Sequence, residues 1–138
     1  MQLKMNIAEL EDFFDEAFPG NNHSDHIFEK LEVGRTRLKL IPNDKMLRPG
    51  GIISGPTQMA LADRAAYAVI LAHIGPVAMA VTSNLNMSFL RGAEQKPLLA
   101  DAELLKLGRR LATVDVRLWQ DDPAEIIAQS TVTYAIPR

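Results

Sequence analysis

The sequence predicts an α+β fold in which a curved antiparallel sheet wraps around one long central helix, with an extra helix at the N-terminus. One observation is an alanine-rich segment, residues 54–74, that has helical spacing and almost no polar face. A second is the alternation of apolar and polar residues after residue 76, which short turns divide into consecutive strands. One sheet can bury a helix that is apolar all round only by curving around it.

The composition limits the classes of protein to consider. The 138 residues, 47% of them hydrophobic, suffice for one domain with a real core, and we expect residues 1–138 to form a single domain. The net charge of −2 is spread along the chain and gives no electrostatic footprint for nucleic acid. Asp63 and Arg64 interrupt the longest apolar run, which is then too short to span a membrane. We expect neither nucleic acid nor a membrane as a partner.

Two further features indicate the compartment. The first residues carry acidic side chains and lack the basic region of a secretory signal. The chain contains no cysteine, which excludes disulfides, thiol catalysis and thiolate metal sites and fits a reducing compartment. We therefore expect a cytoplasmic protein.

The first part of the chain predicts a short helix followed by extended segments. Residues 6–18 place their apolar side chains on one stripe, as in an amphipathic helix, and a Pro-Gly-Asn-Asn break ends it. Residues 31–41 are predicted to form one strand whose alternation is disturbed near Gly34, and residues 45–48 a short second one. Residues 49–51 then form a tight approach to the long helix.

The long helix is well delimited in the sequence. Pro56 suits the first helical position, where a missing N–H costs nothing, and Gly75 followed by Pro76 suits the C-terminal end. Ala, Leu and Met, which have the best helix propensities, dominate between these limits. His73 lies near the C-terminal end, where we expect it to be packed or favoured by the helix dipole rather than catalytic.

Four strands are predicted after the helix. Residues 77–89 have a strong two-residue pattern of apolar and polar side chains, which predicts a long, half-buried strand. Residues 98–107, 109–119 and 126–136 predict three more, with Gly108 in the first of two tight turns between them. Short turns between consecutive strands favour an antiparallel meander.

Asp63 is the most unusual residue of the long helix. Aspartate is a poor interior helix residue because its side chain competes for backbone hydrogen bonds. Its neighbours one turn away are Met59, Ala60, Ala66 and Tyr67, which leave the carboxylate partly desolvated, as enzymes arrange for bases and nucleophiles. Alternatively, Asp63 points into water or caps a neighbouring segment, and the helix taken alone slightly favours this second interpretation.

Three segments in a fixed order carry a family resemblance. They are Ser-Gly-Pro leading to Leu-Ala-Asp at residues 54–63, the strand at residues 81–91 and the Lys-Leu-Gly-Arg-Arg-Leu-Ala turn at residues 106–112. From about residue 31 onward the chain resembles the hotdog-fold acyl-CoA thioesterases, and within them the branch of phenylacetate-degradation and 4-hydroxybenzoyl-CoA thioesterases. The resemblance implies a hotdog fold.

The resemblance also implies roles for two residues of the helix. In that family a His-Gly-Gly box opens the helix and an acid follows nine residues after the histidine, so that Ser54, Gly55 and Pro56 stand at the box and Asp63 at the acid. Asp63 is then the nucleophile or general base for acyl-CoA hydrolysis, and the Gly55 N–H polarises the thioester carbonyl. A donor at a helix N-terminus suits an oxyanion. No cofactor and no metal are implied.

Several positions depart from the family pattern. Ser54 replaces the box histidine, Pro56 removes one N–H, and Arg48 stands where an amide side chain is common. Tyr67 lies one turn beyond the acid. We expect Arg48, Ser54 and Tyr67 to contact substrate, together with Asn84, which could reach the pocket from the polar side of its strand.

The phosphates of CoA need basic partners, and the candidates are Arg91, Lys106, Arg109 and Arg110. Taken singly, Arg109 and Arg110 are explained as well by keeping a turn solvated. In the family the acid and the N–H donor come from different subunits, which implies a homodimer or a dimer of dimers with the active site at the subunit interface.

Two function classes stay open from the sequence. Asp63 favours an acyl-CoA thioesterase acting on an aryl or medium-chain acyl group, whereas Ser54 and Pro56 favour a non-catalytic protein that binds acyl-CoA or another small apolar ligand. Met59, Tyr67 and Met87 could line an apolar pocket, and the N-terminal helix could cover it. Histidines at 23 and 26 with Asp25 suggest a metal only weakly, since a polar loop explains them better.

Overall fold

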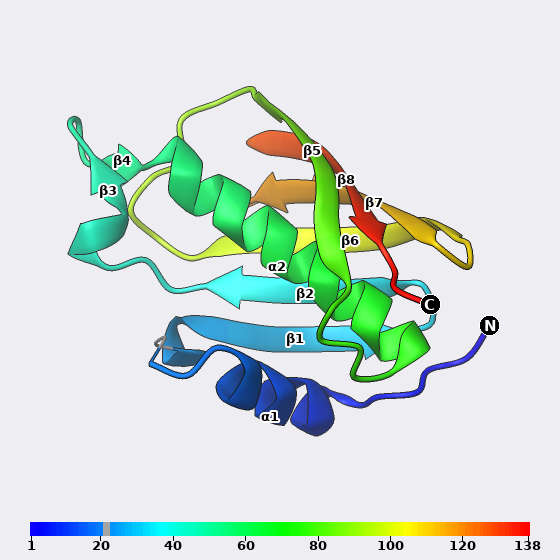
Figure 1. The fold of residues 1–138 in the computed structure, drawn as a ribbon. Helices are drawn as coiled ribbons and strands as arrows, with labels where there is room; N and C mark the ends of the chain where they lie inside the picture. Colours follow the sequence, from blue (N-terminus) through cyan, green and yellow to red (C-terminus); the bar gives the residue numbers. More distant parts are fainter. Residues whose placement is uncertain (21–22) are drawn as a thin grey trace.

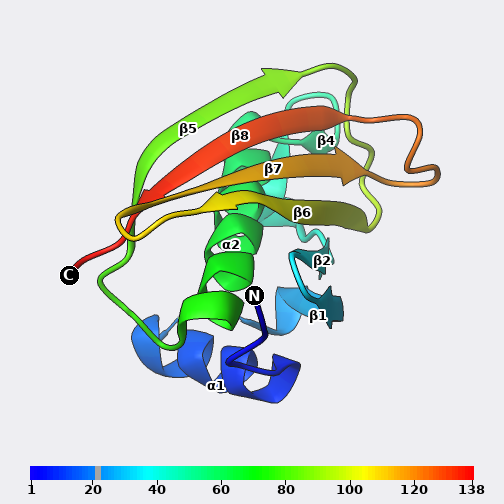
Figure 2. The same cartoon turned by 90° about the vertical axis from the view of Figure 1, so that its right-hand side faces the viewer.

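The fold class predicted from the sequence is confirmed. In the computed structural model, which describes residues 1–20 and 23–138, a six-stranded antiparallel sheet curves around helix α2 (Gly55–Ile74), as Figures 1 and 2 show from two sides. The extra N-terminal helix, α1 (Ile7–Ala17), packs against α2 and the first strand. Asn6 and Glu9 form a capping box at its start. The predicted break at residues 19–22 ends outside the described residues.

The strand order of the sheet is β1-β2-β6-β7-β8-β5, so β1 and β5 form its two edges. A separate two-stranded ribbon of β3 and β4 precedes α2 (Figure 1). The strands have these bounds: β1 His26–Glu32, β2 Arg35–Leu40, β3 Leu47–Arg48, β4 Ile52–Ile53, β5 Val81–Phe89, β6 Leu98–Leu107, β7 Leu111–Trp119 and β8 Ala128–Ala135. The predicted meander is therefore present as β6, β7 and β8.

The ends of α2 have the predicted signals. The Ser54 side chain accepts a hydrogen bond from the Thr57 N–H at 3.3 Å, which caps the N-terminus, and proline occupies the first turn. Gly75 ends the helix with a φ of 93°, a conformation that favours glycine. Ser54, Pro56 and Gly75 therefore define where the helix begins and ends.

Small residues allow α2 to lie deep inside the curve of the sheet. Ala65, Ala66, Ala68 and Ala72 are all fully buried. The sheet supplies larger apolar residues to the same core: Leu38, Leu98, Val114, Val116, Leu118 and Val132. Each such side chain contributes roughly 1.5–3 kcal/mol on burial, so the core, rather than helix propensity, holds α2 in place.

The single strand predicted for residues 31–41 is wrong, because this region is a hairpin. Strands β1 and β2 pair from His26↔Leu40 to Glu32↔Arg35, and a two-residue loop joins them at Gly34, which has a φ of 80°. Polar and apolar side chains do not alternate regularly along β1, so its first residues were not predicted to form a strand. His73 holds the turn to α2, since its ring accepts from the Gly34 N–H at 3.0 Å and bonds the Val69 carbonyl at 2.7 Å. His73 is packed, as predicted.

Two other predicted strands have different limits. Residues 44–46 form a short 3₁₀ turn, so that the strand predicted at 45–48 is reduced to β3. The strand predicted from residue 77 begins at Val81, because the chain first turns after Gly75. β5 is also largely exposed rather than half-buried, since it is an edge strand.

The two N-terminal histidines serve the fold. His23 lies in a 3₁₀ turn and His26 opens β1, and no group of histidines and carboxylates within residues 1–20 and 23–138 is arranged to hold a metal. Burial, helped by the charge of Arg64, lowers the pKa of His26 to about 4. Among the described helices, none has the length and apolarity needed to cross a membrane.

The close packing of α2 against the sheet can be tested by enlarging a buried side chain of the helix. Ala68→Leu adds volume at a fully buried helix position and should lower the free energy of unfolding by about 1–3 kcal/mol. The matched control is Ala8→Leu on the exposed side of α1, which should change it by less than about 0.5 kcal/mol. Urea denaturation of the three proteins measures both effects, and equal stabilities would contradict the packing described.

The lowered pKa of His26 predicts a pH effect on stability. Because the ring titrates at about 4 when folded and near 6.5 when unfolded, the unfolded chain binds more protons between these values. The wild type should therefore lose about 1–2 kcal/mol more than His26→Leu when the pH falls from 7 to 4.5, after allowance for the partial exposure of the ring. Urea denaturation at both pH values tests this, and parallel pH dependence would refute it.

Candidate functional site

Asp63 lies in a pocket of about 610 Å³ between the two helices and the edge of the sheet. The middle of α2 forms its floor, α1 one wall, and the segment leading into β5 together with β8 the other. The lining residues are Phe14, Phe18, Ala60, Asp63, Arg64, Tyr67, Ala78, Ala80, Val81, Thr82 and Tyr134. The pocket thus combines an apolar, largely aromatic lining with one carboxylate and one guanidinium.

Two hydroxyl groups hold the Asp63 carboxylate. Tyr134 donates to its Oδ1 at 2.8 Å and Thr82 donates to the same oxygen at 2.7 Å. Oδ2 has no hydrogen-bond partner among the described residues, so one oxygen is oriented by protein and the other is free for chemistry. Burial, with a further contribution from the Asp63 charge, raises the pKa of Tyr134 far above its ordinary value, which keeps this hydroxyl a donor.

Aromatic rings continue the pocket away from Asp63. The rings of Tyr134 and Tyr67 stack with centroids 5.3 Å apart, and Phe14 of α1 and Phe18 just after it meet Tyr67 edge-on at 5.8 and 6.3 Å. The Tyr67 hydroxyl donates to the Ala78 carbonyl at 2.9 Å, and burial raises its pKa. Flat walls of this kind favour aryl or other slender apolar groups. Met59 and Met87, two residues expected there, do not line this pocket.

Gly55 lies far from Asp63 within one chain. The two are eight positions apart on the same helix, which is about 12 Å along the axis at 1.5 Å per residue. The Gly55 N–H has no partner among the described residues, because Ser54 caps Thr57 and Pro56 carries no N–H. A free donor and a free carboxylate oxygen therefore exist on one helix, two turns apart.

Ser54 and Arg48 lie near Gly55 rather than near Asp63. The Ser54 hydroxyl is engaged in the helix cap and shares a 2.8 Å hydrogen bond with the Thr57 hydroxyl. Arg48 is exposed on β3, where its Nε donates to the Pro49 carbonyl at 3.3 Å. Of the residues expected to contact substrate, only Tyr67 shares a pocket with Asp63.

A β-bulge explains why Asn84 is not in this pocket. Thr82 lies opposite Tyr134, but Asn84 lies opposite Thr133, because the register shifts by one residue at Ser83. Since Tyr134 and Thr133 point to opposite faces of β8, Thr82 and Asn84 point to opposite faces as well. The bulge brings Thr82 to Asp63 and directs Asn84 away from it.

The basic residues expected to bind CoA fall into two groups. Lys106, Arg109 and Arg110 are exposed around the Gly108 turn, and the Arg110 carbonyl accepts from the Ile136 N–H, just after the end of β8 that carries Tyr134. Arg91 follows the opposite end of β5. From Val81 to Phe89 this strand is about 26 Å long at 3.3 Å per residue, which separates Arg91 from the Gly108 turn. One chain does not bring the four together.

Thr82, Tyr134, Phe18 and Arg64 line the pocket but were absent from the predicted site. Tyr134 had one usable signal, because it falls on the apolar face of its strand, where a buried tyrosine hydroxyl requires a partner. Thr82 had none, since its contact depends on the bulge. Phe18 follows α1 and Arg64 lies on α2, so their presence in one pocket depends on how the two helices pack.

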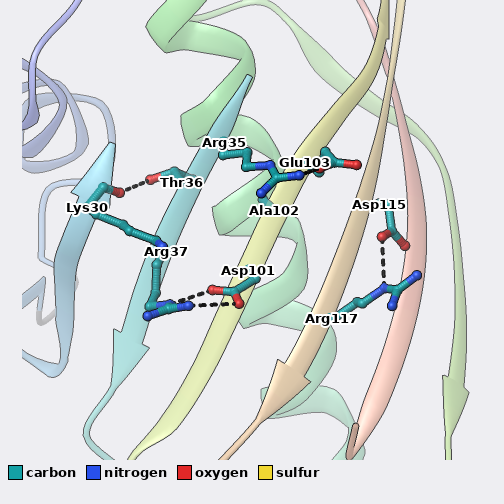
Figure 3. A pocket seen from close by; sticks show the side chains of 9 residues that line it. All are labelled: Lys30, Arg35, Thr36, Arg37, Asp101, Ala102, Glu103, Asp115 and Arg117. Carbon is teal, nitrogen blue, oxygen red and sulfur yellow. Dashed lines mark hydrogen bonds and ion pairs between the residues drawn. The ribbon is translucent and has the colours of Figure 1, made fainter. Parts of the chain in front are cut away.

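A second hollow, of about 360 Å³, lies on the outer face of the sheet, with α2 behind it (Figure 3). Opposite charges fill it in pairs: Arg37 binds Asp101 through two bonds of 2.6 and 3.1 Å, and Arg35 and Arg117 pair with Glu103 and Asp115. Trp119 also donates to Asp101, at 3.0 Å. These side chains satisfy one another, so this hollow is a paired polar surface.

Comparison with known proteins places the chain in a family. The family model of the thioesterase superfamily matches residues 50–127. A candidate esterase of Saccharolobus solfataricus is 33% identical over 112 residues, which cover 80% of this chain and 73% of that protein. The crystal structure of a candidate thioesterase of Silicibacter sp. is 40% identical, with a TM-score of 0.90, and covers 100% of this chain and 96% of the other.

A more distant structure has the same fold. A candidate thioesterase of Ralstonia eutropha, related to phenylacetic acid degradation, superposes with a TM-score of 0.76 at 24% identity and covers 90% of this chain and 98% of the other. The curved sheet, the buried helix and the family match agree with the resemblance seen in the sequence. The chain belongs to the thioesterase superfamily and has its hotdog fold.

Proposed function

We propose that this protein hydrolyses an acyl-CoA thioester to a free acid and CoA. The observation that carries the proposal is the Asp63 carboxylate at an aromatic pocket, with Oδ1 held by two hydroxyls and Oδ2 free. Asp63 acts as a general base: Oδ2 takes a proton from a water whose oxygen attacks the thioester carbon. The C–S bond then breaks and CoA leaves as a thiol after protonation. Direct attack by Oδ2 would use the same geometry.

The oxyanion donor in this proposal is the Gly55 N–H of a second copy of the chain. A donor must lie within about 3 Å of the carbonyl oxygen while the base reaches the same carbonyl group through one water. The separation of about 12 Å along α2 is too large for Gly55 and Asp63 of one chain to do so. A two-fold dimer removes the conflict, because each site takes Asp63 from one chain and Gly55 from the other.

Strand β5 supports a definite way for two copies to meet. It is an edge strand whose outer backbone groups have no partner strand among the described residues, and Val81 and Phe89 near its ends are about half exposed. Antiparallel pairing of β5 with its two-fold copy puts the Phe89 end of one chain beside the Thr82 end of the other. Phe89 lies against Gly55, and Thr82 binds Asp63, so this pairing brings the two functional groups together.

The same pairing would unite the basic residues. Arg91 at one end of β5 would approach Lys106, Arg109 and Arg110 at the other end of its copy, which gives the CoA phosphates several cationic partners. A hypothetical thioesterase of Streptococcus pneumoniae, solved with coenzyme A, has the same fold at 17% identity and a TM-score of 0.75. The aromatic lining supports an aryl or medium-chain acyl group, and the cytoplasmic location stays a prediction.

The second candidate function is binding without hydrolysis. It is favoured by the helix entrance, where the Ser54 hydroxyl is occupied by the cap and Pro56 offers no N–H. Only the Gly55 N–H is then left for the carbonyl oxygen. A protein of this kind would hold acyl-CoA in the same pocket and release it unchanged.

The proposed mechanism predicts that two single substitutions strongly reduce turnover. Asp63→Asn keeps the shape of the side chain but removes the base, and Gly55→Pro removes the free N–H where the helix tolerates proline and Ser54 is already extended, with a ψ of 153°. Each should lower kcat for aryl- or fatty-acyl-CoA esters about a hundredfold or more, measured as thiol release.

Circular dichroism and thermal unfolding should show that both variants are folded. A loss of rate then reports on the chemical step. The wild type should cleave at least one ester of the panel. Binding of acyl-CoA without thiol release by the wild type would contradict hydrolysis and favour the binding protein. Full activity of Asp63→Asn would contradict the role of the carboxylate.

A further inference from the structure

Arg64 is a cation at the pocket that forms no ion pair among the described residues, although the Asp15 charge attracts it. Its Nη2 contacts His23 Nδ1 at 2.7 Å, and its guanidinium lies 4.3 Å from the centre of the Phe14 ring. No carboxylate in the described part of the chain forms an ion pair with it, and its buried Nε–H has no hydrogen-bond partner there. Burial lowers its pKa to about 10, which leaves it charged at neutral pH.

A desolvated charge of this kind normally has a partner, because burying an unpaired ion is costly. Arginine presents five donors in a fixed fork, and one ring nitrogen of a neutral imidazole satisfies only one of them. His23 is itself fixed in this role, since its other nitrogen contacts the Phe18 carbonyl at 3.1 Å. The guanidinium is therefore held in place with donors to spare.

Arg64 lines the same pocket as the Asp63 carboxylate, and it also borders a neighbouring hollow lined by Asp15, His23 and His26. Arg64 and Asp63 both line the shared pocket, but neighbouring residues on a helix point about 100° apart, so the two charges do not neutralise each other. The stacked rings of Tyr134 and Tyr67, and then Phe14, lead from one to the other. A molecule whose carbonyl lies at Asp63 would extend along these rings toward Arg64.

We propose that Arg64 selects acyl groups that end in a carboxylate, so that the preferred substrates are ω-carboxyacyl-CoA thioesters. This inference rests on the proposed hydrolysis and deepens it. The thioester lies at Asp63, the acyl chain lies along Tyr67, and the distal carboxylate accepts from the guanidinium of Arg64. Planar carboxylates match the arginine fork, and desolvation on the aromatic lining strengthens the pair.

The test compares two thioesters of equal shape, adipyl-CoA and 6-methylheptanoyl-CoA, in which an isopropyl end replaces the carboxylate. The wild type should have the higher kcat/KM for adipyl-CoA. Arg64→Gln should lower the adipyl to methylheptanoyl ratio of kcat/KM about tenfold or more, and Arg64→Lys should lower it less. Arg35→Gln, on the far side of the sheet, removes the same charge and should leave the ratio unchanged.

The ratio separates selection from a structural role, because a variant that only loosens the fold lowers both rates together. An unchanged ratio in Arg64→Gln would overturn the inference while leaving hydrolysis standing. If the wild type cleaves neither these two esters nor any of the aryl- or fatty-acyl-CoA panel, the proposed function fails, and titration calorimetry of the same two ligands decides the inference. Tighter binding of adipyl-CoA that is lost in Arg64→Gln would support it, and equal binding would refute it.

Discussion

The structure depends on the burial of α2 inside the curve of a single sheet. Because alanines line this helix, it lies close to the strands and cannot shift without opening the core. The same rigid element carries the Gly55 N–H at its start and the Asp63 carboxylate two turns later. Their separation is therefore fixed by helix geometry at about 12 Å, so the proposed hydrolysis requires the two groups to come from different chains.

The rest of the pocket is arranged around that fixed carboxylate. Edge strand β5 supplies Thr82, its neighbour β8 supplies Tyr134, and α1 closes the far side with Phe14. The hydroxyls orient one oxygen of Asp63, while the aromatic rings provide an apolar wall for the region where an acyl group would lie. Arg64, the next residue of α2, lines the same pocket, and we infer that it meets the far end of such a group. The inferred division of labour follows from consecutive positions on one helix.

Much of the architecture was predictable, because apolar periodicity indicates which faces are buried and capping residues indicate where helices end. Pro56, Ser54 and Gly75 delimit α2, and the alternation after residue 97 gives the meander. The β1–β2 hairpin was missed because β1 is an edge strand with polar residues on both faces. The site was harder: the bulge at Ser83 inverts the faces of β5, so alternation pointed to Asn84 although Thr82 makes the contact. The place of Arg64 depends on helix docking, which no local pattern encodes.

The central claim, that each site is shared between two chains, is tested most directly by complementation. Asp63→Asn and Gly55→Pro chains are refolded together in equal amounts, and thiol release is compared with that of each variant alone. Half of the dimers should be mixed, each with one intact site, so activity should recover to about a quarter of the wild-type value. Activity that stays at the mean of the two variants would contradict the shared site.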